Sequence, residues 1–293
     1  MTAAPSAAPG AAAPIVRVWA ASWRLLVFFL AWALLVAPAL IPAIGPLRER
    51  LGPFVQIYAE AVTLTSALLA AAVMTRWVDR RPLGDLGFRR ERALADTLVG
   101  LLIGVGAVGF AVAALWLGGY AEPIAGLLDP RRLGLAVAVT MLNAAAQEVL
   151  MRSYLQPMFA ARLGRTAAVV LVAVLFALLH WGALRGAALP TLNVFLAGVW
   201  FGAAYALTGR LWLPIAIHVG WNALLGPVLG LTVSGRDIGA GWRLFELDGP
   251  ALVSGGGFGL EGGLAATAAV VIAIAATAAY GRPRRGATIP AAP

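Results

Sequence analysis

Residues 133–160, LGLAVAVTMLNAAAQEVLMRSYLQPMFA, decide the fold class of this chain. The stretch is apolar over more than the roughly 17–25 residues that a membrane-spanning helix needs, yet it carries Glu148 and Arg152. Apolar runs of similar length recur at 23–44, 54–75, 93–118, 167–184, 187–208, 211–231 and 262–280. The sequence therefore predicts an all-α fold, a polytopic transmembrane helical bundle of about eight spans.

The composition supports the same class and excludes others. The chain is 61% hydrophobic and 12% charged, which is typical of a membrane protein and not of a soluble domain. Cysteine is absent from the sequence, which excludes disulfides, thiolate metal sites and a cysteine nucleophile. The net charge of +9 comes from arginines in short loops between apolar runs, which favours membrane lipid and not nucleic acid as the partner.

The chain divides into an Ala/Pro-rich N-terminal tail over 1–22, expected to be disordered, a transmembrane domain over 23–284, and a C-terminal tail over 285–293. No signal peptide is expected ahead of the first span. Arginines are roughly twice as frequent in the segments that share the side of the N-terminus as in those opposite, so both termini should be cytoplasmic. We expect an integral protein of the bacterial inner membrane. The Gly-rich segment 232–261 would then lie outside, as a plain connector or as a flexible cap.

Five polar side chains within the apolar runs are candidates for one shared site. Glu148 and Arg152 are four residues apart, so they lie on one helix face and can pair. His180 ends another run, and His218 and Asn222 lie one turn apart in a third. Each has a plain structural explanation as an ion pair, an interfacial histidine or an interhelical hydrogen bond. Because ionisable groups are costly in a bilayer, three helices that bring such groups to similar depth predict a common pocket.

These side chains suit hydrolysis. Neutral imidazoles can bind a metal or hold a water, a carboxylate can act as general base, and arginine or asparagine can stabilise an oxyanion. The HExxH motif is absent, so a divalent metal such as Zn²⁺ would need ligands from separate spans, His180, His218 and Glu148. Counting from the cytoplasmic helix ends places Glu148 and His180 at about 20 Å depth and His218 at about 10 Å. Helix tilt would have to absorb that mismatch.

Three motifs carry a resemblance to a known family. They read Gln147-Glu148-Val-Leu-Met-Arg152, Phe176-Ala-Leu-Leu-His180 and His218-Val-Gly-Trp-Asn222. In order and spacing they resemble the CAAX-protease and bacteriocin-processing (CPBP) family of intramembrane metalloproteases, which includes the type II CAAX prenyl endopeptidases. That family carries Glu-Glu-x-x-x-Arg, Phe-x-x-x-His and His-x-x-x-Asn or Asp on successive transmembrane helices. The motif-bearing core spans about 133–230.

The resemblance implies a function and roles for the residues. The family cleaves a peptide bond near a hydrophobic or lipidated C-terminus of a membrane-associated peptide or protein. By analogy, Glu148 would activate water, His180 and His218 would hold that water or a metal, and Arg152 would position Glu148. Asn222 and His218 would steady the oxyanion.

One departure from the family pattern leaves the activity open. The family's first glutamate is Gln147 here, and a glutamine cannot accept a proton as a general base. Glu148 could serve instead, the chemistry could be slow or altered, or the chain could have kept the fold and lost hydrolysis. In the last case it would act as a membrane scaffold, an immunity factor or a peptide-binding protein. A transporter is a further alternative, although no inverted repeat is evident.

Overall fold

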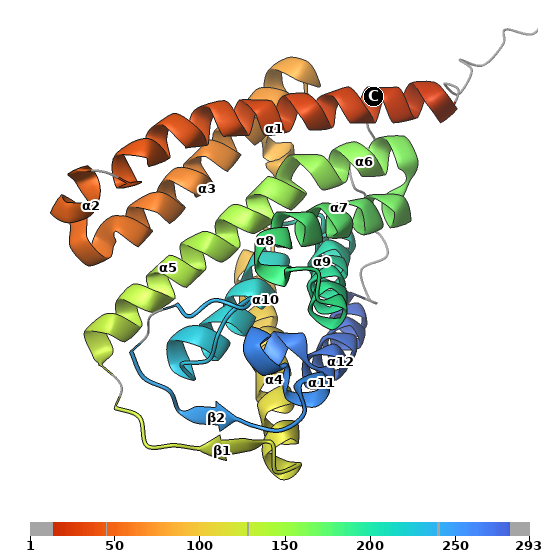
Figure 1. The fold of residues 1–293 in the computed structure, drawn as a ribbon. Helices are drawn as coiled ribbons and strands as arrows, with labels where there is room; N and C mark the ends of the chain where they lie inside the picture. Colours follow the sequence, from red (N-terminus) through yellow and green to blue (C-terminus); the bar gives the residue numbers. More distant parts are fainter. Residues whose placement is uncertain (1–13, 45, 128, 239–240, 282–293) are drawn as a thin grey trace, which may run out of the picture.

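The computed structural model describes residues 14–44, 46–127, 129–238 and 241–281, and nearly all of their regular structure is helical (Figure 1). The longer helices are α1 (Pro14–Ile44), α3 (Val55–Val73), α4 (Ala93–Leu117), α5 (Pro130–Glu148), α6 (Gln156–Leu163), α7 (Arg165–Leu179), α9 (Ala188–Thr208), α10 (Trp212–Ala223) and α12 (Leu264–Gly281). Short helices α2 (Pro46–Leu51), α8 (Trp181–Leu184) and α11 (Ala251–Ser254) join them. The all-α prediction is confirmed.

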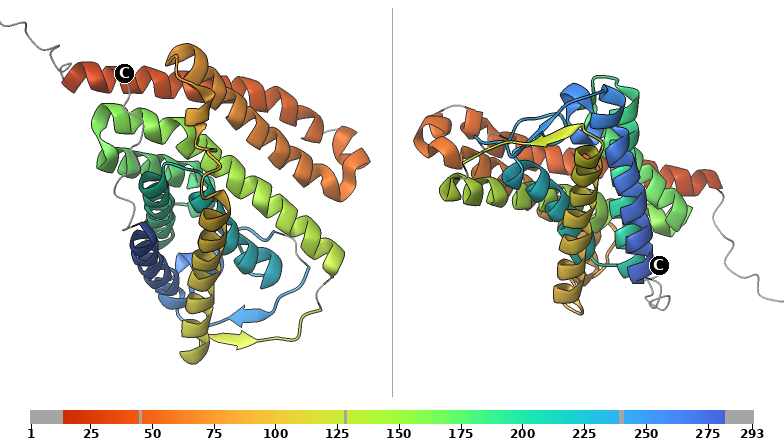
Figure 2. Two further views of the ribbon diagram at one scale, coloured as in Figure 1. Left: turned by 180° about the vertical axis from the view of Figure 1, so that it is seen from behind. Right: turned by 90° about the horizontal axis from the view of Figure 1, so that it is seen from below.

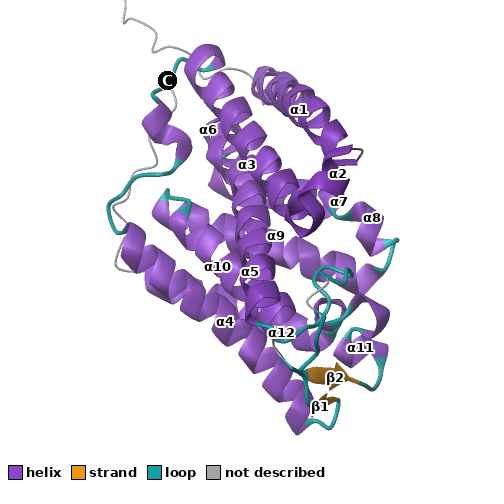
Figure 3. Cartoon of the chain, turned by 90° about the vertical axis from the view of Figure 1, so that its left-hand side faces the viewer, coloured by secondary structure: helices purple, strands orange, loops and turns teal. Residues whose placement is uncertain are grey.

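The helices pack in successive layers. Figure 1 shows α1 and α3 along one edge, α5 crossing the middle, and α4, α9, α10 and α12 beyond it. In the right-hand view of Figure 2, which looks at the molecule from below, α4 and α12 stand side by side. Strands β1 (Ala121–Pro123) and β2 (Phe245–Leu247) pair antiparallel at one end of the bundle, with Glu122 opposite Glu246 (Figure 3).

In the described part of the chain, six helical segments are long and apolar enough to cross a membrane, so the prediction of eight spans is wrong in number. The six are 14–40, 55–78, 93–117, 130–163, 188–208 and 264–281. The expected spans 167–184 and 211–231 fall short because α7 has 15 residues and α10 has 12. At about 1.5 Å per residue, α7 is about 22 Å long, against a hydrocarbon core of about 30 Å. Helix α7 ends in a turn at His180, and α10 passes into a π-helical turn, Leu224–Val228, that contains Pro227.

The N-terminal boundary also differs from the prediction. Helix α1 begins at Pro14, so residues 14–22 are helical and do not belong to a disordered tail. Residues 1–13 and the predicted C-terminal tail, 285–293, lie outside the described residues.

The outer faces of the helices carry the apolar side chains that a membrane protein requires. On α4, Leu94, Leu98 and Leu102 follow one another at one-turn intervals, and each is more than half exposed. A soluble protein would bury such a stripe, whereas acyl chains solvate it. The chain is therefore an integral membrane protein.

Close helix packing places α10 in the interior. Gly100 and Gly104 face α10, and a Cβ at Gly100 would lie 2.7 Å from the Cβ of Ala216. A Cβ at Gly104 would collide with the carbonyl oxygen of Ile217. This small-xxx-small pair lets the two helix backbones approach closely.

The start of α10 is fixed by a buried ion pair. Arg210 Nη2 lies 2.7 Å from Asp96 Oδ2, and Tyr280 Oη donates to Asp96 Oδ1 at 2.8 Å. Asp96 is fully buried in the first turn of α4, so the start of α10 is anchored against the start of α4. The depth mismatch of about 10 Å expected for His218 does not keep it from Glu148, since His218 Nδ1 lies 2.9 Å from Glu148 Oε1.

Candidate active site

Glu148 is the centre of a buried polar cluster at the end of α5. Its Oε1 accepts hydrogen bonds from Arg152 Nη1 at 3.1 Å and from His218 Nδ1 at 2.9 Å. Both Glu148 and Arg152 are fully buried. The structure thus brings together three residues of two predicted motifs, and the i,i+4 pair forms as expected.

The helix between these residues is locally unwound. A π-helical turn, Val149–Leu155, separates α5 from α6. Pro157 has no N–H to donate to the carbonyl of Ser153, which favours an irregular helix at this point. π-Helical turns inside α-helices are often found at functional sites.

Arg152 is held through both of its terminal nitrogens, while its Nε has no hydrogen-bond partner among the described residues. Its Nη2 donates to the carbonyl oxygen of Gly198 on α9 at 3.1 Å. Its guanidinium carbon lies 5.1 Å from the ring centroid of Phe176 and 5.7 Å from that of Phe201. The aromatic faces and the carboxylate together compensate a buried positive charge.

His218 is oriented by its neighbours. Its ring stacks on Phe201 with a centroid distance of 4.5 Å and an interplanar angle of 16°. An ionised carboxylate can only accept hydrogen bonds, so His218 Nδ1 donates to Glu148. The other ring nitrogen, Nε2, is therefore the one available to the cavity.

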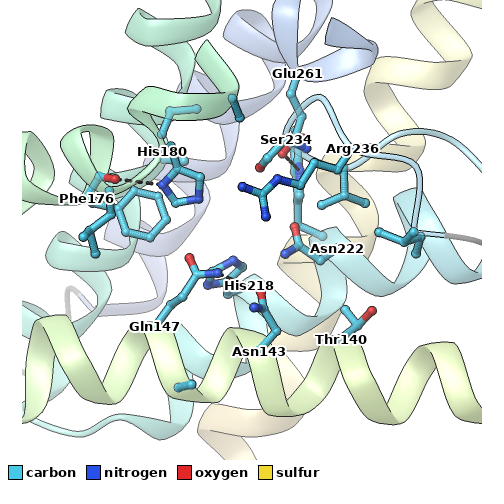
Figure 4. A pocket seen from close by; sticks show the side chains of 18 of the residues that line it. Thr140, Asn143, Gln147, Phe176, His180, His218, Asn222, Ser234, Arg236 and Glu261 are labelled. Carbon is cyan, nitrogen blue, oxygen red and sulfur yellow. Dashed lines mark hydrogen bonds between the residues drawn. The ribbon is translucent and has the colours of Figure 1, made fainter. Parts of the chain in front are cut away.

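His180 is the cap residue between α7 and α8, and its tautomer is set by the backbone. Its Nδ1 lies 2.8 Å from the carbonyl oxygen of Phe176. A carbonyl only accepts, so Nδ1 donates, and in the neutral ring Nε2 carries a lone pair. Figure 4 shows this ring at the cavity wall, with its hydrogen bond to Phe176.

Gln147 belongs to a second polar chain, on a different face of α5 from Glu148. Its Nε2 donates to Asn143 Oδ1 at 2.7 Å, and Asn143 Nδ2 donates to Glu60 Oε2 at 3.0 Å. Gln147 Oε1 is buried and has no hydrogen-bond partner among the described residues. An acceptor of this kind is available to a bound water or substrate.

A cavity of about 530 Å³ lies between these helices. Four of the predicted residues line it: Gln147, His180, His218 and Asn222 (Figure 4). The other two, Glu148 and Arg152, do not line it. Glu148 lies behind the wall, where its Oε1 is bound to Arg152 and His218 and its Oε2 has no hydrogen-bond partner among the described residues. Direct action of Glu148 on water stays a prediction.

The expected metal-ligand set does not form. Glu148 lies outside the cavity lining, and its Oε1 is taken up by Arg152 and His218. Within the described part of the chain, no three His, Cys, Asp or Glu side chains are grouped so that they could hold a metal ion. His180, His218 and Glu148 therefore do not fit the ligands of a Zn²⁺ site, and no chemical step is derived through a metal.

Four residues with ionisable carboxyl or guanidinium groups line the cavity and were not predicted from the sequence: Glu60, Arg236, Asp237 and Glu261. Glu60 could have been found, since it is the only ionisable side chain in α3 with a charge at neutral pH, and such a residue in a span marks a site. Arg236, Asp237 and Glu261 belong to the segment 232–261, for which the sequence predicts a plain connector or a flexible cap. Burial raises the pKa of the Glu261 carboxyl, against the opposing effect of hydrogen bonds from Ser234 and Trp221.

One family of known proteins is similar to the middle of this chain. Residues 129–224 match a family model described as type II CAAX prenyl endopeptidase Rce1-like. The match covers about a third of the chain and includes all six predicted site residues, which confirms the resemblance. No curated protein and no solved structure matches the chain.

Proposed function

We propose that this protein is an intramembrane endopeptidase of the CAAX type that cuts near a hydrophobic or lipidated C-terminus of a membrane-associated substrate. The match to the Rce1-like family suggests the protease class. The cavity adds two oriented imidazoles and an asparagine amide inside an apolar bundle. We place the protein in the bacterial inner membrane with both termini cytoplasmic, in keeping with the arginine distribution.

The observation that carries the mechanism is the hydrogen bond from His180 Nδ1 to the carbonyl oxygen of Phe176. It leaves the Nε2 lone pair of His180 free to accept a proton from water as the water oxygen attacks the substrate carbonyl carbon. The C–N bond then breaks, and His180 returns the proton to the leaving nitrogen. Gln147 Oε1, which has no partner among the described residues, accepts a hydrogen bond from the same water without taking its proton.

His218 and Asn222 stabilise the oxyanion that forms when water attacks the substrate carbonyl. His218, with protons on both nitrogens, donates from Nε2 while Nδ1 stays on Glu148, and the Asn222 amide donates beside it. Glu148 and Arg152 are positioning residues in this scheme, because they act on substrate only through His218. This division of roles makes a carboxylate at position 147 helpful but not essential.

The proposal is tested with the full-length protein in proteoliposomes and a membrane-tethered peptide. We expect His180→Ala to reduce kcat by at least about 10²-fold, the usual contribution of a general base. Trp181→Ala is the matched control, since this neighbouring side chain is 59% exposed and does not line the cavity. Equal turnover by the native protein and His180→Ala would remove the assignment.

A second function is favoured by one specific observation, the position of Gln147. It lines the cavity where the family resemblance places a glutamate, so the chain could bind membrane peptides without cutting them. This alternative predicts that the native protein binds but does not cleave the peptide. If the native protein has no activity and Gln147→Glu gains it, the native protein is a peptide-binding protein and not a hydrolase.

A further inference from the structure

A tight turn presents Arg236 to the cavity. Val233 N donates to the Arg236 carbonyl at 2.9 Å, and Arg236 N donates to the Val233 carbonyl at 3.0 Å. The tip residues, Ser234 and Gly235, have φ angles of 48° and 72°. Positive φ is uncommon for a residue such as serine, so this conformation must be held by its surroundings.

Glu261 holds the turn in place. Its Oε2 accepts a hydrogen bond from the backbone N–H of Ser234, and its Oε1 accepts one from Trp221 Nε1 at 2.9 Å. Gly235 packs on the ring of Phe258, where an added Cβ would approach within 2.9 Å. The turn is thereby fixed to α10 and to the segment before α12, so Arg236 has a defined position.

The Arg236 guanidinium points into the cavity, on the side of His180 and Asn222 (Figure 4). Within the described ranges, no hydrogen bond or ion pair engages this group. Its charge acts across the cavity on Glu60 and His180. Among the described residues that line the cavity, Arg236 is the one with a permanent positive charge.

We propose that Arg236 binds the terminal carboxylate of the substrate peptide and so sets how many residues lie between the cut and the C-terminus. A guanidinium matches a carboxylate in a bidentate, charge-assisted pair. Because Arg236 and His180 line one cavity, and an extended residue spans at most about 3.6 Å, only a few residues fit between them. This inference rests on the proposed function for the meaning of the cut, but the binding preference can be measured without cleavage.

The experiment compares two forms of one fluorescent hydrophobic peptide, with a C-terminal carboxylate or a C-terminal amide. Binding to the full-length protein is followed by anisotropy in nonionic detergent without phospholipid. We expect the native protein to bind the carboxylate form at least about tenfold tighter, as a charge-assisted pair implies. Arg236→Gln should abolish this preference by weakening the carboxylate form alone, and Arg236→Lys should retain part of it.

Arg243→Gln is the matched control. Arg243 is an exposed arginine of the same connecting segment and does not line the cavity, so this variant should keep the full preference. Equal binding of both peptides by the native protein, or equal losses in Arg236→Gln and Arg243→Gln, would overturn the inference. Binding of short-chain phosphatidylglycerol that depends on Arg236, with no preference between the peptides, would instead identify a lipid-phosphate site and also overturn it.

The two proposals fail separately. A carboxylate preference that persists while the native protein and His180→Ala show equal turnover leaves the anchor in place and removes the hydrolytic function. Turnover that requires His180 but does not depend on the terminal carboxylate supports the hydrolytic function and removes the carboxylate anchor at Arg236.

Discussion

The buried pair of Glu148 and Arg152 gives the sharpest stability prediction. Arg152→Met keeps an apolar side chain of similar length but leaves the Glu148 carboxylate, fully buried, with His218 as its one remaining partner among the described residues. It also removes the donor to the Gly198 carbonyl oxygen. Breaking a buried pair by removing one partner costs about 3–5 kcal/mol. We therefore expect a loss of about 3–5 kcal/mol in the free energy of unfolding.

A matched surface pair provides the control. Asp85 and Arg89 are also four residues apart, but their atoms lie 3.4 Å apart and the Arg89 side chain is 43% exposed. Exposed pairs contribute about 0–1 kcal/mol, so Arg89→Met should change stability little. Unfolding can be followed by tryptophan fluorescence in mixed detergent micelles, since the chain has 10 tryptophans.

The double variant Glu148→Leu with Arg152→Met decides the cause. Replacing both members of a buried ion pair by apolar side chains is often nearly neutral, so the double variant should recover much of the stability lost in Arg152→Met. If the double variant is less stable than the single one, or if Arg152→Met costs no more than Arg89→Met, the unpaired carboxylate is not the cause and the reasoning is refuted.

Three further predictions concern packing, pH and the protonation of His218. Gly104→Ala should lower the free energy of unfolding by about 1–3 kcal/mol, because the new Cβ collides with the α10 backbone. Gly106→Ala is the control, since a Cβ there meets open space. Equal unfolding curves for the two variants would contradict this prediction. Because burial raises the pKa of the Glu261 carboxyl above its ordinary value of 4.5, the folded protein favours the protonated form, and stability should fall as pH rises above 4.5. Glu261→Gln should flatten that slope, and a variant with the native slope would show that another group is responsible. Glu148→Gln removes the carboxylate that supports the doubly protonated form of His218, so the oxyanion faces a neutral donor in place of a charged one, and kcat should fall by about tenfold with unchanged peptide affinity; unchanged kcat would exclude the oxyanion role.

Helical spacing predicted much of the site. Residues four apart share a helix face, which correctly placed Glu148 with Arg152. The same rule puts Asn143 and Gln147 on a face about 100° away, as their hydrogen bond shows. Spacing alone does not say which of two adjacent faces borders the cavity. Glu148 was therefore expected at the cavity wall, where the structure instead places Gln147.

The number of spans could not be predicted, because hydropathy does not reveal where a helix ends. The apolar stretch of α7 stops in a turn at His180, and α10 starts within the protein on the ion pair of Arg210 with Asp96. Asp96 and Arg210 lie 114 residues apart in the sequence, so no local pattern predicts their contact. Long-range pairing also determines the role of the segment that holds Arg236, since Glu261 and Trp221 fix it from two other elements.

The two polar chains around α5 explain how the site tolerates a glutamine at position 147. On the cavity side, Gln147 is linked through Asn143 to Glu60, so a carboxylate already stands two hydrogen bonds away. A second carboxylate at position 147 would place two negative charges on one short network, where like charges disfavour each other. Behind the wall, Glu148 orients His218 without facing the cavity, and the Phe176 carbonyl orients His180 without any carboxylate. Both imidazoles are thus positioned by groups other than residue 147, so in the proposed mechanism its replacement changes the water site and leaves both imidazoles in place.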